Sequence, residues 1–338
     1  MVLYFCHIRI KKGVKIRKEY IITGNNRCQR KKVLVLICII IILVILWNYI
    51  SYYNKTKIVS HRYEWWLEYL NIKKDYYTST GRNVKVAIID TGVDFSHPDL
   101  KHIPHKIYTI KGINKESNED YEHGTLVAGI ICAKPSDTNG VMGINPNCSI
   151  VSIDISDNNT TADSYGLIEA IQIAMDENVD IINISLGFQV NNEDVHTLIK
   201  EAYSRGIIIV AAAGNDEFSD IIYPAKYNEV LSVGSINKSG KKMYDNTINN
   251  SIIYFPGENI VSTYSSLGSN IMYKSMDGTS LSAPMLTGII SLIYKSNASI
   301  TSKEVYNYFG NNSVNINPKN IIEHFEEEYK WEENSLVE

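Results

Sequence analysis

Apolar and polar positions follow two alternating patterns along most of the chain. Short runs of consecutive apolar residues are typical of strands that are buried on both faces of a sheet. Longer stretches with apolar residues every three or four positions are typical of helices that pack on such a sheet. The strand-like runs lie at 84–89, 150–155, 180–185, 206–212 and 230–235, and the helix-like stretches at 121–133, 164–178, 193–204 and 281–294. This alternation predicts an α/β fold in which a mostly parallel sheet lies between layers of helices.

The N-terminal region has a different pattern. Residues 33–47 form an unbroken apolar run, and residues 48–50 extend it nearly to the length of about 20 residues that a spanning helix needs. Basic residues precede the run and aromatic residues follow it, as at the two ends of a membrane span. These are Arg27, Arg30, Lys31 and Lys32, then Trp47, Tyr49, Tyr52 and Tyr53. A cleaved signal peptide is the alternative, but bulky residues follow where a small-residue cleavage site is required.

We therefore predict one transmembrane anchor at 33–50, with residues 1–32 as a basic cytoplasmic tail and the rest of the chain outside the cell. Residues 51–60 are a polar linker, and residues 61–315 show no internal repeat and form one domain. The acidic segment 316–338 is predicted to be a solvated extension. The net charge of the 338 residues is only −4, which gives no indication of a nucleic-acid partner.

Two of the five cysteines, Cys132 and Cys148, lie in the main domain. Buried free thiols and a disulfide are both compatible with the sequence, because only geometry distinguishes them.

Chemically useful side chains stand at the ends of predicted elements. Asp90 ends the first apolar strand, where open α/β sheets place their functional groups. His123 begins a helix. Ser280 begins the last large helix, where free N–H groups stabilise developing negative charge. Each residue has a structural interpretation on its own, as a cap or a turn residue. Together these three residue types suit acyl transfer, and the Asn215 amide could stabilise an oxyanion.

The motifs that contain these residues resemble a known family. Asp90-Thr91-Gly92, His123-Gly124-Thr125 and the run 278–284, Gly-Thr-Ser-Leu-Ser-Ala-Pro, occur in the order Asp, His, Ser. They resemble the signature motifs of subtilisin-like serine proteases (subtilases, peptidase family S8), and the order distinguishes these from other serine-protease folds. Further likeness lies at 183–187, 212–215 and 223–225, so that the resemblance extends over about 63–311. It implies a three-layer subtilisin-like fold and hydrolysis of peptide bonds.

The resemblance also implies a role for each residue. Ser280 would be the nucleophile, His123 the general acid and base, and Asp90 the carboxylate that orients His123. The Asn215 side chain and the Ser280 N–H would form the oxyanion hole, and no cofactor would be needed for the chemistry. An extended polypeptide would pair with the substrate-binding residues, which are Ser185, Leu186, Gly187, Gly214 and Thr161. His97 is an alternative base, but no Gly-Thr and helix follow it.

A structural calcium ion is a further implication of the resemblance. Its ligands would be Asp99, Asp137, Asn139 and Val141. The alternative for this loop is a plain polar turn.

The predicted function is that of a membrane-anchored serine endopeptidase. A dedicated peptidase that removes the leader or propeptide of a secreted modified peptide, similar to the lantibiotic leader peptidases, is the alternative. A second, more remote alternative is an inactive protease that serves as a binding module. The acids Asp216, Glu217 and Asp220 lie near the expected first specificity pocket. They would either favour Lys or Arg at the cleavage site or form a solvated loop.

Overall fold

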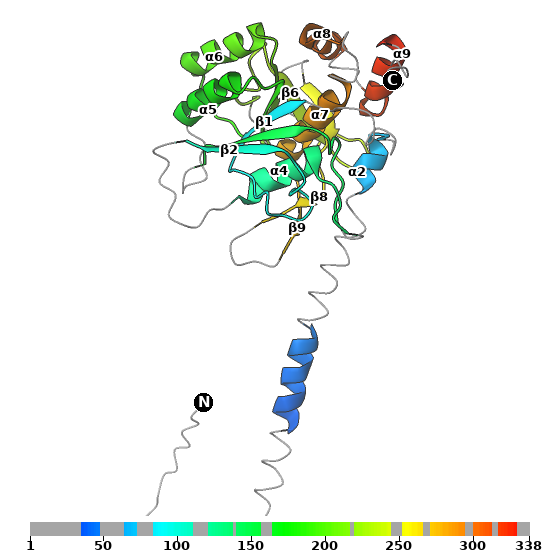
Figure 1. Cartoon of the computed structure of the whole chain (residues 1–338). Helices are drawn as coiled ribbons and strands as arrows, with labels where there is room; N and C mark the ends of the chain where they lie inside the picture. The colour runs from blue at the N-terminus through cyan, green and yellow to red at the C-terminus, as the bar shows by residue number, and fades with distance from the viewer. Residues whose placement is uncertain are drawn as a thin grey trace, which may run out of the picture. The chain divides into compact units, whose positions relative to one another are not determined.

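The computed structural model describes residues 35–47, 64–72, 84–110, 121–137, 140–156, 164–216, 220–244, 252–265, 271–294, 300–312 and 317–329. The chain divides into two units, Met1–Lys55 and Thr56–Glu338. In the first unit, residues 35–47 form a helix with exposed apolar side chains (Figure 1). Over the described ranges, no helix has both the length and the apolar character needed to cross a membrane. The rest of the expected span, 33–34 and 48–50, lies outside these ranges, as do the tail 1–32 and the linker 51–60.

The second unit is built on a seven-stranded sheet in the order β2-β3-β1-β4-β5-β6-β7. All neighbouring strands in it are parallel, and in the register Asp90 lies opposite Asp154 at the ends of β1 and β3. The strands are β1 (Lys85–Asp90), β2 (His105–Thr109), β3 (Ser149–Asp154), β4 (Ile181–Ile184), β5 (Ile208–Ala212), β6 (Leu231–Ile236) and β7 (Ile252–Pro256). The expected mostly parallel α/β sheet is therefore confirmed.

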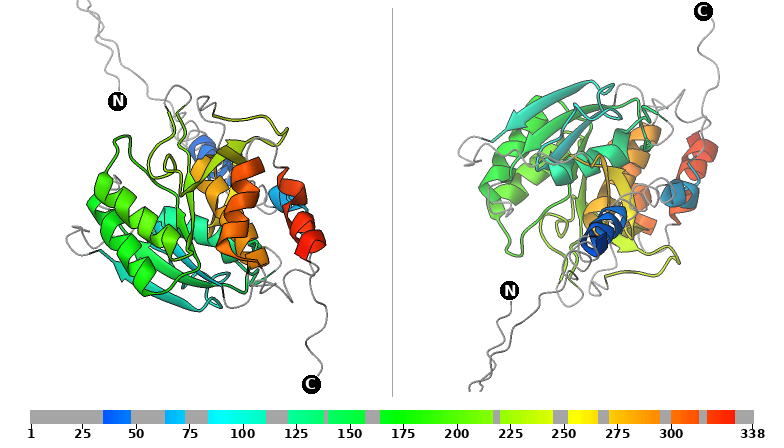
Figure 2. Two further views of the ribbon diagram at one scale, coloured as in Figure 1. Left: turned by 90° about the horizontal axis from the view of Figure 1, so that it is seen from above. Right: turned by 90° about the horizontal axis from the view of Figure 1, so that it is seen from below.

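Alternate side chains of the strands enter two separate cores. Val86 and Ile88 of β1 belong to the core beneath α4 (Glu122–Cys132) and α7 (Thr279–Tyr294). Ala87 and Ile89 belong to the core beneath α5 (Ser164–Asp176) and α6 (Glu193–Ser204). The view from above shows α5 and α6 on one side of the sheet and α7 on the other (Figure 2). Because strand side chains alternate between faces, a continuous apolar run is what a sheet covered on both sides requires.

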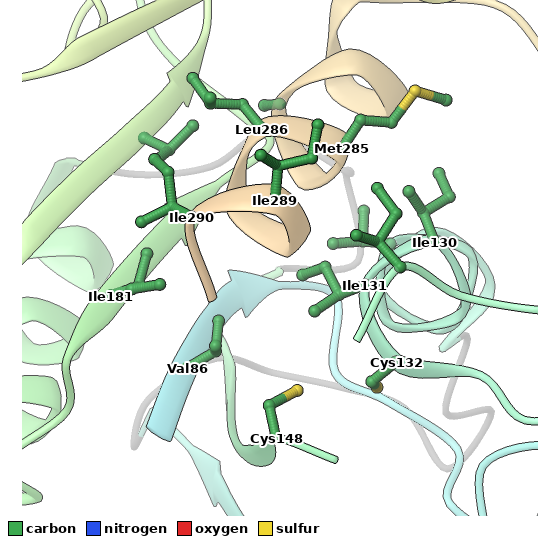
Figure 3. Close-up of a cluster of buried hydrophobic side chains, with 14 of the residues drawn as sticks. Val86, Ile130, Ile131, Cys132, Cys148, Ile181, Met285, Leu286, Ile289 and Ile290 are labelled. Carbon is green, nitrogen blue, oxygen red and sulfur yellow. The ribbon is translucent and has the colours of Figure 1, made fainter. Parts of the chain in front are cut away.

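Helix α7 is buried along almost its entire length. Its Met285, Leu286, Ile289 and Ile290 lie between α4 and the strands (Figure 3). Nearly every position of α7 is buried because helix and sheet surround it, and this packing fixes the position of the first turn, where Ser280 lies.

Cys132 and Cys148 lie in the same core, and both are buried free thiols (Figure 3). The Cys132 thiol donates to the Ala128 carbonyl at 3.0 Å, and the Cys148 thiol donates to the Asn145 carbonyl at 3.3 Å. Of the two alternatives for this pair, the structure has the free thiols. Burial raises the pKa of the Cys132 thiol, which keeps it in the protonated form.

The domain continues beyond the boundary expected at residue 315. Ile321, Ile322 and Phe325 of α9 (Ile321–Tyr329) are buried in the core beneath α7. The acidic residues of this segment suggested a solvated extension, but the helix has an apolar face that packs inward. The remaining elements are α2 (Glu64–Tyr69), β8 (Ile260–Thr263), β9 (Tyr273–Met276), α8 (Ser302–Asn312) and the 3-10 turn Pro318–Asn320. Residues 330–338 lie outside the described ranges.

Candidate active site

Asp90, His123 and Ser280 meet at the carboxyl edge of the sheet. Asp90 is the last residue of β1, and His123 and Ser280 lie in the first turns of α4 and α7. His123 Nδ1 donates to the Asp90 carboxylate, with distances of 2.9 and 3.0 Å to its two oxygens. The Ser280 hydroxyl donates to His123 Nε2 at 3.0 Å. Such a chain of hydrogen bonds can remove the proton from a serine hydroxyl and stabilise the imidazolium that results.

The turn after β1 fixes the start of α4 directly. Thr91 donates its N–H to Asp90 Oδ1 at 2.7 Å, and its hydroxyl accepts the Gly124 N–H at 2.9 Å. Gly124 approaches so closely that a Cβ there would lie 2.0 Å from the Gly92 carbonyl oxygen. Gly92 itself has φ +86°, a conformation that favours glycine. The two motifs therefore form one packed unit that sets the distance between Asp90 and His123.

The environment of His123 favours its charged form. Burial alone would lower the pKa of His123, but the charge of Asp90 and the hydrogen bond to it outweigh burial and raise the pKa above its usual value. Asp90 is 2 % exposed, so its charge acts with little screening by water. His123 can thus accept a proton on Nε2 while its Nδ1 stays hydrogen-bonded to Asp90.

The Asn215 side chain is held in one orientation by Thr279. Asn215 Oδ1 accepts the Thr279 N–H at 2.8 Å and the Thr279 hydroxyl at 2.9 Å. The Asn215 amide nitrogen is then turned toward Gly278, where an added Cβ would lie 3.1 Å from Nδ2 and 3.5 Å from Ser280 Oγ. A donor beside the serine oxygen is placed to bind an oxyanion. The sequence reasoning missed Thr279, although it is the residue before Ser280 in the quoted motif.

A sequence profile described as "Subtilase family", Peptidase_S8, matches residues 81–326. The chain belongs to the subtilase family. The major intracellular serine protease of Bacillus subtilis is 38 % identical over 224 residues, which cover 63 % of this chain and 69 % of that protein. The expected serine endopeptidase activity is therefore confirmed at the level of the family, whose chemistry needs no cofactor.

Solved subtilase structures have the same fold. Fervidolysin from Fervidobacterium pennivorans, a keratinolytic enzyme, matches with a TM-score of 0.64 and 24 % identity, over 72 % of this chain and 40 % of fervidolysin. The prenylagaramide maturation protease PagA matches with a TM-score of 0.63 and 23 % identity, over 75 % of this chain and 97 % of PagA. The subtilisin-like fold predicted from the motifs is confirmed.

In this subtilase, the expected substrate-binding residues lie on two neighbouring segments. Ser185, Leu186 and Gly187 directly follow β4, and the Ser185 hydroxyl accepts a hydrogen bond from the Asn183 amide at 2.9 Å. Gly214 has φ +104° and directly precedes Asn215. The fifth residue, Thr161, lies outside the described ranges.

His97 is not available as a base in this subtilase. Its Nε2 donates to the Met272 carbonyl at 2.8 Å, and its Nδ1 accepts the Asp99 N–H at 3.1 Å. Burial lowers the pKa of His97 and outweighs the opposing effect of nearby carboxylates, so the ring is neutral and structural.

The expected calcium loop of the subtilase does not fit a cation. Asp99 is fully buried, and its oxygens accept the N–H of Ser136 at 2.7 Å, the N–H of Val141 at 2.9 Å and the hydroxyl of Tyr273 at 3.0 Å. Calcium requires oxygen ligands that point at it. Here the N–H groups of Ser136 and Val141 point at the carboxylate, so hydrogen-bond donors, and not further oxygen ligands, surround Asp99. Of the other expected ligands, Asp137 and Val141 are described, whereas Asn139 lies outside the described ranges.

Proposed function

We propose that this subtilase is a membrane-anchored endopeptidase with Ser280 as its nucleophile. The Ser280 oxygen attacks the scissile carbonyl carbon while its proton passes to His123 Nε2, and His123 then gives that proton to the leaving amine. In the second step His123 takes a proton from water, the water oxygen attacks the ester carbonyl carbon, and His123 returns the proton to the Ser280 oxygen. Asp90 orients the imidazole, and the Asn215 amide together with the Ser280 N–H binds the oxyanion. The observation that carries this proposal is the continuous hydrogen-bonded chain from Asp90 through His123 to Ser280.

The catalytic proposal is tested with an active-site probe. A fluorophosphonate should label the wild-type chain on Ser280, and Ser280→Ala should abolish both labelling and peptide hydrolysis. Ser282→Ala is not a suitable control, because the Ser282 hydroxyl is buried against the Pro256 carbonyl at 2.9 Å. The exposed Ser239→Ala is suitable and should label normally. A wild-type chain that folds but neither labels nor hydrolyses peptides would favour the inactive binding module.

The anchor is the second part of the proposal. The exposed apolar side chains of the helix at 35–47 support it, together with the basic residues before the run and the aromatic residues after it. With the N-terminus in the cytoplasm, the catalytic domain faces the outside. External protease added to intact cells should then remove an epitope placed at the C-terminus and leave one at the N-terminus intact. Protection of the C-terminal epitope in intact cells, with digestion after lysis, would contradict this orientation.

Dedicated processing of a secreted peptide is the second candidate function. PagA, which has this fold, is a maturation protease, and this favours the same class of task for the present chain. A library of unrelated peptides should then be cleaved poorly compared with precursor peptides encoded beside this gene. Broad cleavage of the library would favour a general surface protease instead.

A further inference from the structure

Ile222 occupies a fixed position between the two expected substrate-binding segments. Its N–H donates to the Ala213 carbonyl at 3.2 Å. The next residue, Tyr223, exchanges two backbone hydrogen bonds of 2.9 Å with Phe188, and this bridge joins the segment to the continuation of Ser185–Gly187. The backbone of Ile222 is therefore tied to both neighbouring segments and cannot move away from either one alone.

The Ile222 side chain contacts the two glycines on these segments. A Cβ added at Gly187 would lie 2.7 Å from Ile222 Cδ1, and one added at Gly214 would lie 3.3 Å from Ile222 Cγ2. Gly187 and Gly214 have no side chains of their own, so the Ile222 side chain occupies the space beside both α-carbons, together with the Tyr223 carbonyl oxygen, which would lie 2.4 Å from a Cβ added at Gly187. Ile222 is only half-buried, which means that part of its side chain still faces the solvent.

The bound peptide must place one side chain in this region. The inference rests on the proposed function, in which the scissile carbonyl carbon lies at Ser280 Oγ and its oxygen at the Asn215 amide. Gly214 directly precedes Asn215, and the substrate backbone pairs with Ser185–Gly187 on the opposite side. The residue that donates the scissile carbonyl therefore directs its side chain between Gly187 and Gly214.

We propose that Ile222 limits this residue of the substrate to glycine, alanine or serine. A leucine, phenylalanine or lysine side chain would need the volume that Ile222 already occupies. Displacing the Ile222 side chain would break its packing against both glycines. Its backbone is held by its own hydrogen bond to Ala213 and by the hydrogen bonds of the next residue, Tyr223, to Phe188. Ile222 is thus the residue that determines specificity at the cleavage site.

Asp220, the acid nearest Ile222 in the chain, gives little support for the rival preference, cleavage after lysine or arginine. Asp220 Oδ1 accepts the Ile221 N–H at 2.8 Å, and Asp220 Oδ2 forms an ion pair with Lys226. A carboxylate already paired with a lysine of its own chain has little attraction left for a cationic side chain of the substrate.

The test uses the full-length protein in detergent and a series of fluorogenic peptides that differ only at the residue before the scissile bond. Wild type should cleave after alanine about 100-fold faster, in kcat/KM, than after phenylalanine, because a few methylene groups in a filled site cost factors of this order. Ile222→Ala should raise kcat/KM for the phenylalanine peptide by about 10-fold or more and leave the alanine peptide within a factor of about 3. Ile107→Ala, the same change at an exposed position of β2, should leave both values as in wild type.

Each result is read together with fluorophosphonate labelling of Ser280. Normal labelling with equal cleavage after alanine and phenylalanine would overturn the inference on Ile222 and leave the catalytic proposal intact. Absence of labelling in wild type would overturn the catalytic proposal and this inference with it. If Ile222→Ala does not label because it misfolds, Ile222→Val serves instead, and no gain for the leucine peptide in that variant would overturn the inference.

Discussion

Two hydrogen bonds from Thr279 orient the Asn215 amide, one from its N–H and one from its hydroxyl. Thr279 donates this hydroxyl to Asn215 Oδ1 at 2.9 Å and accepts the Gly214 N–H on the same oxygen at 3.2 Å. It therefore joins the turn that carries the proposed oxyanion donor to the first turn of the helix that carries Ser280. Thr279 is a positioning residue, since it acts on the reaction through Asn215.

Replacing Thr279 by valine should lower kcat about 10-fold with little change in KM, because the loss of about 1–1.5 kcal/mol of hydrogen bonding lets the amide rotate. Asn215→Ala removes the donor itself and should cost about 10²–10³ in kcat. Thr279→Ser keeps the hydroxyl and should restore the rate. A Thr279→Val variant that keeps the wild-type rate would contradict this role of the hydroxyl. Steady-state kinetics of the three variants on one peptide decide this.

The raised pKa of His123 predicts the pH dependence of the enzyme. In the proposed mechanism the neutral imidazole is the base, so kcat/KM should rise with pH through a midpoint above 6.5, the usual histidine pKa. Asp90→Asn removes the charge that raises this pKa. The midpoint should then move to lower pH, and activity should fall by about 10⁴. Asp176→Asn, at an exposed position, is the control. An unchanged midpoint in Asp90→Asn would contradict the assignment of Asp90 as the partner of His123.

At the residue scale, the sequence was informative for reactive side chains that stand at the ends of predicted strands and helices. Asp90, His123 and Ser280 each stand at the end of an element, and parallel strands bring such ends to one edge. The sequence could not predict the contacts of Ile222 or the acceptor role of Asp99. Those contacts join segments that are distant in the chain, such as Asp99 and Tyr273, 174 residues apart.

At the scale of elements, long apolar segments were predictable and short edge strands were not. The five strands of continuous apolar character are all present. β2 was missed because four of its five residues are exposed at the sheet edge, which removes the apolar signal. β7 was missed because its sequence ends in proline, which is uncommon in a strand. The hydrogen bond from Tyr273 to Asp99 was not predicted either, because Tyr273 is the first residue of the short strand β9.

The hydrogen bonds around Asp99 predict stability that does not depend on calcium. Tyr273→Phe removes one donor from a fully buried carboxylate, at a cost of about 1.5–3 kcal/mol, and should lower Tm by several degrees. The shift should be equal with and without a calcium chelator. Tyr203→Phe, at a largely exposed position, is the matched control. A wild-type Tm that falls on chelation alone would contradict the interpretation that donors replace the ion. Differential scanning fluorimetry measures the Tm of each of the three proteins with and without the chelator.

At the scale of the whole molecule, the C-terminal helix belongs to the catalytic unit. Its composition is acidic, and this concealed the three buried side chains that connect it to the core of α7. The family profile agrees with the structure, since its match ends at residue 326 and not near 315. Average charge is a poor guide to a domain boundary when a short amphipathic helix lies close to it.

Phe325→Ala should therefore destabilise the entire domain by about 3–5 kcal/mol, since Phe325 is 1 % exposed and its loss leaves a cavity. Glu327→Ala, on the exposed side of the same helix, should change stability by less than about 0.5 kcal/mol. Chemical denaturation followed by tryptophan fluorescence measures both. Equal stabilities of the two variants would show that the helix is not part of the cooperative unit.

The arrangement of the three proposed catalytic residues along the chain also sets when the enzyme becomes active. Ser280 follows His123 by 157 residues, so at 5–20 residues per second the ribosome adds it about 8–30 s later. The helix that carries Ser280 also completes the core on one face of the sheet. A nascent chain therefore has neither the proposed nucleophile nor a closed fold. Synthesis itself delays hydrolytic activity until almost the whole domain has emerged, and this protects the growing chain from its own catalytic centre.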